Sequence, residues 1–361
     1  MKKICVIILF TICLVSCISK NEKPYQKYEI TDVTDFKNMK MPDVEYFTLE
    51  KIPTPEVNGF FLVYADTILV VFNYANPDPY IISLYNIKTL EFIAGCMKKG
   101  SGPGEMISPM VKLRNNRLDV TDIQCHNITS INIDSILVTK FDYCPDIVHI
   151  DHPPMDYILK KDTLVVANPY FVNGYGVSKE VPNFLIYDSH SGIALEKNKE
   201  NEEFNPFNTC SRRIFYNNKH NHYVEFWNRF PIMNIYNQNF ELIKQYRGYE
   251  SDEVKFGIVE TMLMPIGEFS SSFFWYGCQT SKHIYIVNDQ MPKYKRDTED
   301  YTNQEIWCID YDYNINRRLK PKDFTIPSCL MSCNDDTGNI FICAFDDEGE
   351  IGLFKLNFES K

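Results

Sequence analysis

The segment Ile68–Asn73, ILVVFN, is a short apolar strand that follows a polar turn, and segments of the same kind recur along the chain. Six copies start at Ile68, Leu118, Leu164, Tyr223, Ile284 and Ile340, and their starts are separated by 50, 46, 59, 61 and 56 residues. A long internal period is typical of repeat folds, in which each repeat is one small group of secondary-structure elements. We therefore expect one repeat architecture rather than several ordinary domains.

Each copy is one strand of a larger predicted group. Another apolar strand precedes it, from FLVYAD at Phe61 to CLMSCN at Cys329, and a third strand follows it, from ISLYNI at Ile82 to IGLFKL at Ile351. Five repeats show a fourth strand, at residues 91–96, 137–142, 193–198, 242–247 and 316–321. Four strands per repeat are typical of a propeller blade.

The sixth repeat ends at Lys361 without a fourth strand, and a spare strand, VEYFTL, lies at Val44–Leu49. Pairing of this segment with the last repeat would close a ring and remove open sheet edges. The sequence therefore predicts an all-β protein, in which residues 43–361 form a six-bladed β-propeller of four-stranded antiparallel blades, the last blade closed by an N-terminal strand. A sandwich predicts no long period, and a solenoid predicts polar caps at both ends.

The N-terminus has the pattern of an export signal. Two lysines precede a largely apolar run, Ile4–Val15, which is shorter than the roughly 20 residues that span a bilayer. The run ends in Leu14-Val15-Ser16-Cys17, which resembles the bacterial lipobox. The resemblance implies a signal peptide at residues 1–16 and a lipid thioether on Cys17; an ordinary secretory signal is the alternative.

Residues 17–42 are largely polar, and we predict a lipidated N-terminus and tether that holds the domain off a membrane. Ile18, the second residue of the mature chain, gives no retention signal for the inner membrane. The expected location is the bacterial cell envelope, with a lipid anchor in the outer membrane and the domain facing either the periplasm or the exterior.

A further stretch, Lys98-Lys99-Gly100-Ser101-Gly102-Pro103-Gly104-Glu105, resembles the Gly-x-Gly-Pro-Gly-Glu signature of the TolB-like six-bladed β-propeller lipoproteins of Bacteroidetes-type bacteria. Proteins of that family also carry a lipobox and a short tether. The resemblance implies the same fold, but no particular activity, because most members have no assigned function. As a phosphate-binding loop the stretch lacks the Lys-Ser/Thr ending, so we expect a turn-rich loop.

Charge and cysteine content exclude several classes of protein. The formal net charge of −11 and the lack of a Lys/Arg stripe predict no nucleic-acid partner. Nine of the twelve cysteines follow Cys17, and their odd number and scattered positions favour buried small hydrophobes over a disulfide framework. Cys329 and Cys333 would lie about 13 Å apart on a strand, too far to share one metal ion.

No motif in the chain predicts catalytic chemistry. The stretch His149-Ile150-Asp151-His152 has ligand-type side chains, but it lacks a third ligand at an interpretable spacing. No Ser-His-Asp signature, nucleophile elbow or zincin helix is present. The sequence therefore predicts no catalytic residue, no metal site and no cofactor.

Long loops are expected at one end of the blades, where second strands lead to third strands and one blade leads to the next, and tight turns are expected at the other end. Binding groups on rigid scaffolds concentrate in long loops. The candidate ligand-binding residues are polar and aromatic side chains in those loops or at their borders: Glu105, His149, His152, Tyr170, Tyr175, Arg229 and Trp275.

Aromatic rings beside charged groups suit a glycan or protein surface. We therefore predict a non-enzymatic, envelope-anchored binding module for a protein or glycan partner, which contacts the long-loop end around the central channel. The alternative is a propeller enzyme, either a metal-dependent lactonase-type hydrolase or a glycan-cleaving enzyme, with carboxylates that meet at that channel.

Overall fold

The computed structural model of the chain describes residues 32–57, 59–73, 80–102, 104–107, 109–122, 124–142, 145–149, 156–160, 163–167, 176–177, 184–187, 212–228, 231–239, 241–248, 255–259, 262–266, 274–289, 304–322, 326, 330–346 and 349–358. Strands make up most of these residues, and the one α-helix among them, α2 (Ile133–Thr139), has seven residues. The all-β prediction is confirmed. No helix in this part of the chain is long and apolar enough to cross a membrane.

Most strands form antiparallel groups that follow the order of the sequence. The first group is β3 (Phe60–Tyr64), β4 (Ile68–Phe72), β5 (Ile82–Asn86) and β6 (Phe92–Cys96), and the next is β9 (Pro109–Arg114), β10 (Arg117–Asp122), β11 (Asn127–Asn132) and β12 (Val148–His149). Further groups are β17 (Arg212–Asn217), β18 (His222–Trp227), β19 (Ile232–Tyr236) and β20 (Leu242–Arg247), and then β23 (Phe274–Gln279), β24 (His283–Asp289), β25 (Gln304–Asp310) and β26 (Ile315–Pro321). Every first, second and third strand that the sequence predicts is present.

The group between β12 and β17 departs from the antiparallel prediction. β13 (Asp156–Lys160) and β14 (Thr163–Ala167) are antiparallel, but β14 pairs with β16 (Phe184–Tyr187) in parallel, and β15 (Gly176–Val177) forms the outer edge. In chain order, β15 is therefore an extra short strand between the second and third predicted strands of this repeat. The fourth strand predicted at residues 193–198 lies outside the described residues.

The segment predicted to complete the last repeat lies beside it. β27 (Leu330–Cys333), β28 (Ile340–Phe345) and β29 (Ile351–Phe358) are followed in the sheet by β2 (Val44–Ile52), which pairs antiparallel with β29 from Phe47↔Phe358 to Ile52↔Leu353. The other end of β2 pairs in parallel with β26. Phe47 is fully buried and meets the Phe358 ring edge-on, with centroids 6.4 Å apart.

Two short pairs lie outside these groups. β7 (Lys98–Lys99) and β8 (Glu105–Met106) pair in parallel around the glycine-rich stretch, and β21 (Lys255–Val259) forms a hairpin with β22 (Met262–Ile266) within residues predicted as a long loop.

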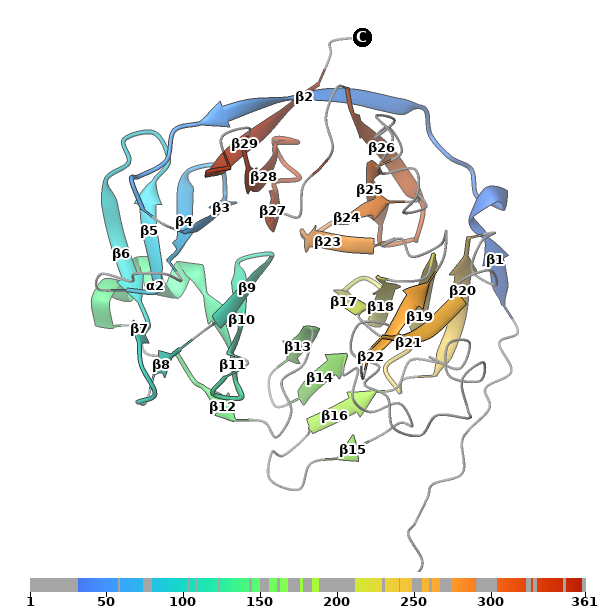
Figure 1. Cartoon of the computed structure of the whole chain (residues 1–361), viewed down its shortest axis with the longest axis horizontal. Helices are drawn as coiled ribbons and strands as arrows, with labels where there is room; N and C mark the ends of the chain where they lie inside the picture. The colour runs from blue at the N-terminus through green and yellow to red at the C-terminus, as the bar shows by residue number, and fades with distance from the viewer. Residues whose placement is uncertain are drawn as a thin grey trace, which may run out of the picture.

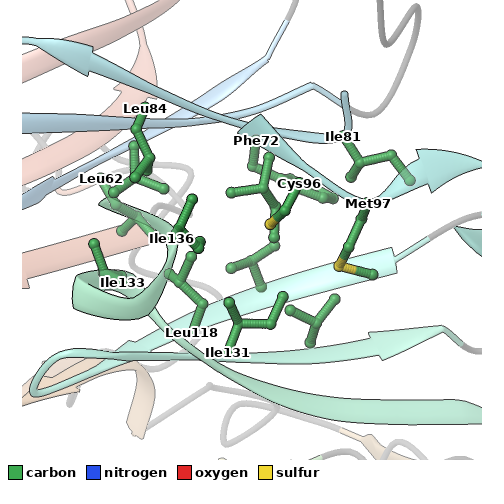
Figure 2. Close-up of a cluster of buried hydrophobic side chains, with 14 of the residues drawn as sticks. Leu62, Phe72, Ile81, Leu84, Cys96, Met97, Leu118, Ile131, Ile133 and Ile136 are labelled. Carbon is green, nitrogen blue, oxygen red and sulfur yellow. The ribbon is translucent and has the colours of Figure 1, made fainter. Parts of the chain in front are cut away.

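Figure 1 shows the groups arranged around a centre, with β3, β9, β13, β17, β23 and β27 nearest to it. Apolar clusters fill the space between neighbouring groups. One cluster joins Leu62, Leu84 and Cys96 of the first group to Leu118 and Ile131 of the next, as Figure 2 shows. Strands that are apolar on both faces, such as β4, suit this position between two layers.

Side-chain hydrogen bonds form the tight turns that separate the strands. Asn86 Oδ1 accepts hydrogen bonds from the backbone N–H groups of Lys88 and Thr89, and Asp310 Oδ1 accepts from those of Asp312 and Asn314. Such Asx turns explain why Asn and Asp follow so many strands in the sequence.

The strand predicted at residues 137–142 is wrong, because this segment continues a helix. Asn132 caps α2 with its side-chain oxygen, which accepts a hydrogen bond from Ser135 N, and Asp134 lies in the first turn. Ile133 and Ile136 lie on one face of the helix and are buried against the first cluster (Figure 2). The 3₁₀ turn η2 (Lys140–Asp142) follows, and the edge strand of this group is β12.

Two short elements lie within the predicted tether at residues 17–42. β1 (Val33–Asp35) adds in parallel to the edge of β20, and the 3₁₀ turn η1 (Phe36–Asn38) follows it. Phe36 is 5% exposed and packs against the rings of Tyr246 and Trp307. This stretch is polar in composition, but the Phe36 side chain packs into an apolar cluster of the domain. Residues 1–31, with Cys17 and the signal peptide, lie outside the described residues.

Candidate functional site

A cavity of about 430 Å³ lies among the central strands. Its lining includes the first residues of three of these strands, Phe60, Asp156 and Leu330, and the last residues of two second strands, Phe72 and Phe345. Second strands end where the loops to the third strands begin. The cavity therefore lies at the end of the molecule for which the sequence predicts the long loops.

Apolar and aromatic side chains form much of the cavity wall. The Phe60 and Phe72 rings are stacked, with centroids 6.5 Å apart. Met110 and Phe345 are 45% and 54% exposed, so they mark the side on which the cavity opens to solvent. Tyr276 adds an aromatic ring on β23.

Charged side chains form another part of the wall. Lys112, on β9, places its Nζ 2.5 Å from Asp156 Oδ2 and also donates to the carbonyl oxygen of Ile214 at 3.2 Å. The same Nζ lies 4.1 Å from the centre of the Phe215 ring. Burial lowers the pKa of Lys112, and the Asp156 carboxylate opposes that shift. Lys112 thus joins β9 to both β13 and β17.

Asp156, the first residue of β13, is the centre of this network. Its Oδ2 also accepts a hydrogen bond from Ile214 N at 2.9 Å, and its Oδ1 accepts one from Tyr157 N at 2.9 Å. Arg114 Nη2 lies 3.4 Å from Oδ1. Burial by itself would raise the pKa of Asp156, but the positive charges of Lys112 and of two arginines outweigh it and lower the pKa. The carboxylate is therefore held ionised.

Asp119, on β10, is the second buried carboxylate that lines the cavity. Arg114 Nε lies 2.8 Å from Asp119 Oδ2, close enough for an ion pair but outside hydrogen-bond geometry, and Ser130 Oγ donates to Oδ1 at 2.7 Å. Burial raises the pKa of Asp119, although Arg114 acts against the shift. Asp119 also lines a second cavity of about 160 Å³ at the tight-turn end, with Arg114 and Gln279.

The arrangement combines flat apolar surfaces with fixed polar groups. Arg213, on β17, also lines the main cavity, and its guanidinium carbon lies 5.8 Å from the centre of the Tyr276 ring. Lys112, Arg114 and Arg213 are the cationic neighbours that lower the pKa of Asp156, and Lys112 and Arg213 line the cavity together with the two carboxylates. Convergent polar groups in an apolar pocket are typical of ligand sites.

Two of the sequence-predicted site residues are described with their side chains, and neither lines the main cavity. Glu105 Oε2 accepts a hydrogen bond from Gly102 N at 2.9 Å, so the carboxylate closes its own loop. A Cβ atom on Gly100 would collide with this carboxylate, so a larger residue there would displace the Glu105 side chain. His149 is exposed at the end of β12, where its Nδ1 lies 3.2 Å from Asn127 Oδ1.

The other predicted residues are not tested by the structure. His152, Tyr170, Tyr175 and Arg229 lie outside the described residues. Trp275 lies in β23 next to Tyr276, and its side chain is not described.

Sequence reasoning missed Lys112, Asp119, Asp156 and Arg213. Each stands inside or at the start of an apolar strand, in VKLR, LDVTD, DYILK and RRIFY. A charge in a strand that is buried on both faces needs a partner, and that requirement is the signal that could have identified these residues. Within the described residues, no group of three or more His, Cys, Asp or Glu side chains could hold a metal ion.

Comparison with known proteins shows similarity to solved structures only. No protein-family profile matches the chain, and no curated protein matches it. A protein of Bacteroides fragilis described as exported is 12% identical, with 91% of this chain and 99% of that chain covered and a TM-score of 0.44. A member of the DUF4221 family from Bacteroides vulgatus is 10% identical, with 87% and 97% covered and a TM-score of 0.45. A streptogramin B lyase is 10% identical, with 87% and 98% covered and a TM-score of 0.43.

Proposed function

We propose that this chain is an envelope-anchored, non-enzymatic binding protein, built on a six-bladed β-propeller and binding its partner at the central cavity. Each group of strands that starts with one of the six innermost strands corresponds to one blade. The antiparallel pairing of β2 with β29 supports closure of the last blade by the N-terminal strand. The glycine-rich stretch and the lipobox support membership of the TolB-like lipoproteins.

One observation carries the binding proposal, namely the central cavity itself. Its volume of about 430 Å³ falls in the range of small-ligand pockets, about 300–1,000 Å³. Aromatic rings such as Tyr276 offer flat surfaces for the C–H face of a sugar, and the Arg213 guanidinium offers hydrogen-bond donors for its hydroxyl groups. Among the predicted partners, a glycan with one terminal sugar in the cavity fits best.

The test is a glycan array probed with the purified protein, followed by calorimetry with the best-bound oligosaccharide. Arg213→Ala and Tyr276→Ala should each weaken binding at least about tenfold, or about 1.4 kcal/mol. Lys219→Ala is the matched control, because Lys219 forms an exposed ion pair with Asp312 at the tight-turn end. Equal affinities for all three variants would refute the site. If the protein binds no glycan on the array, a protein partner is the remaining form of the binding proposal.

The loop residues predicted from the sequence provide an independent test of the binding end. Alanine substitutions of Tyr170, Arg229 and Trp275 should weaken the same binding without a shift in the melting temperature. If substitutions in the tight turns abolish binding while these do not, the assignment of the binding end is wrong.

Anchoring in the membrane rests on the lipobox-like residues before Cys17. Mass spectrometry of the mature N-terminus should show acyl chains on Cys17, and fractionation should place the protein in the outer membrane. Cleavage at another position with release of a soluble protein would refute the lipid anchor.

A glycan-cleaving enzyme is the second candidate, and one observation favours it. Burial raises the pKa of Asp119, whereas cationic neighbours lower the pKa of Asp156 in spite of its burial. Two carboxylates with pKa values moved apart are the general pattern of an acid and its partner in glycoside hydrolysis. Release of reducing ends from a bound glycan, abolished by Asp119→Asn, would establish this activity. Metal analysis of the purified protein tests the lactonase alternative separately.

A further inference from the structure

Two cysteines on neighbouring central strands face each other closely. Cys278 lies on β23 and Cys333 is the last residue of β27, and their sulfur atoms are 3.0 Å apart. Even carbon atoms, which are smaller than sulfur, have their optimal non-bonded separation at about 3.5–4.0 Å. The two sulfurs are therefore closer than ordinary packing places them.

The surroundings of the pair differ at its two ends. Cys278 is 1% exposed within the apolar cluster that contains Ile306 and Leu319, whereas Cys333 is partly exposed and packs against the same cluster. Of the two residues, Cys333 is therefore the more exposed. A third thiol, Cys308, is buried in this cluster as well.

We propose that Cys278 and Cys333 form a redox-active pair that closes to a disulfide between β23 and β27. A disulfide has a sulfur–sulfur distance of about 2.04 Å, so closure needs an approach of only about 1 Å. Gly277, next to Cys278 on β23, and Met331, two residues before Cys333 on β27, line the central cavity. The bond would therefore fix one wall of the cavity.

The reaction needs an oxidant, which is the disulfide of an exchange partner such as oxidised glutathione or a thiol–disulfide oxidoreductase. The Cys333 thiolate attacks one sulfur of that disulfide and releases one thiol of the partner. The Cys278 thiolate then attacks the Cys333 sulfur of the mixed disulfide and releases the second thiol. Two electrons and two protons leave the cysteine pair, and the partner is reduced to two thiols.

Burial makes this exchange slow in the folded protein. Burial, together with the neighbouring Cys278 thiol, raises the pKa of Cys333 well above its usual range, and burial raises the pKa of Cys308 to about 12. Few thiolates are therefore present at neutral pH. The test consequently includes refolding, during which every thiol is accessible.

The experiment is disulfide mapping of the full chain, both after incubation of the folded protein with oxidised glutathione and after refolding in a glutathione buffer. Free thiols are then alkylated in denaturant, and the digest is analysed by mass spectrometry without reduction. We expect the linked Cys278–Cys333 peptide pair, and we expect a reductant to lower the melting temperature of the oxidised protein by several degrees.

Cys308→Ser is the matched control, because it removes a thiol from the same cluster and should leave the Cys278–Cys333 link and its reductant sensitivity unchanged. Cys333→Ser should abolish both. Alkylation of Cys278 and Cys333 after both treatments, or a link from either one to Cys308, would overturn the proposal.

Discussion

Replacing Asp156 by Asn removes a buried negative charge while it preserves the size of the side chain. In the wild type the carboxylate faces Lys112 Nζ at 2.5 Å and Arg114 Nη2 at 3.4 Å and accepts two backbone hydrogen bonds. The asparagine oxygen can keep one of these acceptor positions, but its NH₂ group would meet a donor at the other. Removal of one partner from a buried ion pair costs about 3–5 kcal/mol. We expect Asp156→Asn to lower the free energy of unfolding by about 4 kcal/mol.

A double-mutant cycle separates the pair from its surroundings. Lys112→Met should cost less than Asp156→Asn, because the carboxylate keeps Arg114 and both backbone donors. In the double variant the unpaired ammonium is also gone, so the loss should be smaller than the sum of the two single losses by more than about 1 kcal/mol. Denaturant unfolding followed by tryptophan fluorescence measures all four proteins. Additive losses, or a loss below about 1 kcal/mol for Asp156→Asn, would contradict the network.

The same variant should change how stability depends on pH. The pKa of Asp156 is lowered in the folded protein, so its contribution to stability is present above the unfolded value of about 3.9 and is lost as the pH falls through the folded pKa. The difference between wild type and Asp156→Asn should therefore narrow in acid. In the wild type the pKa of Lys112 is lowered to about 7, so stability rises as the pH rises above that value; in the variant the opposing carboxylate is gone, so this rise should begin at a lower pH. Unfolding curves at a series of pH values test both directions.

Three further predictions concern the N-terminal segment and α2. Phe36→Ala should lower the free energy of unfolding by about 3 kcal/mol, because this ring lies 5.3 Å from Trp307 and is 5% exposed; denaturant titration measures the loss. Deletion of residues 18–31 removes no described contact and should leave the melting temperature nearly unchanged, whereas deletion of residues 18–50 exposes the edge of β29 and should lower it strongly or cause aggregation. Equal behaviour of the two truncations would contradict closure. Asn132→Ala should cost about 1 kcal/mol, and Asn132→Asp, which keeps the cap, should cost much less in the same titration.

The strand pattern was predictable because each strand is short, apolar and followed by a turn with its own chemistry. Asn86 and Asp310 form their turns with backbone groups two to four residues away, so the sequence next to each strand contains the information needed to end it. The pairing of β2 with β29 was also predictable, because a missing strand at one terminus matched a spare strand at the other. These inferences depend on the local pattern of strands and turns and on the number of strands in each repeat.

The helix α2 was missed because its buried face is short. Its buried residues are Ile133 and Ile136, three residues apart. Two apolar positions are too few to distinguish a helical period from a strand period. The useful signal was the Asn132-Ile133-Asp134-Ser135 start, which places a capping side chain and an acidic first turn before the apolar residues. Phe36 gave a weaker signal. A lone aromatic residue in a polar stretch is common in exposed segments too, and its burial depends on the β20 edge, more than 200 residues away in the chain.

The partners of the charged residues in the cavity cannot all be inferred from the neighbouring sequence. Glu225, in YVEFWN, is fully buried, yet its partners are local: Trp227 lies two residues along the strand, and Asn234 faces it in register on β19. A reader of the sequence could therefore satisfy that charge within one sheet. The hydrogen bonds of the Lys112 ammonium instead cross between groups, because it donates to Asp156 on β13 and to the carbonyl oxygen of Ile214 on β17. A buried charge that its own sheet cannot satisfy must point to a neighbouring sheet, and in a radial arrangement innermost strands meet at the axis. Searching such a sequence for charges unsatisfied within their own repeat would therefore select residues around the central cavity.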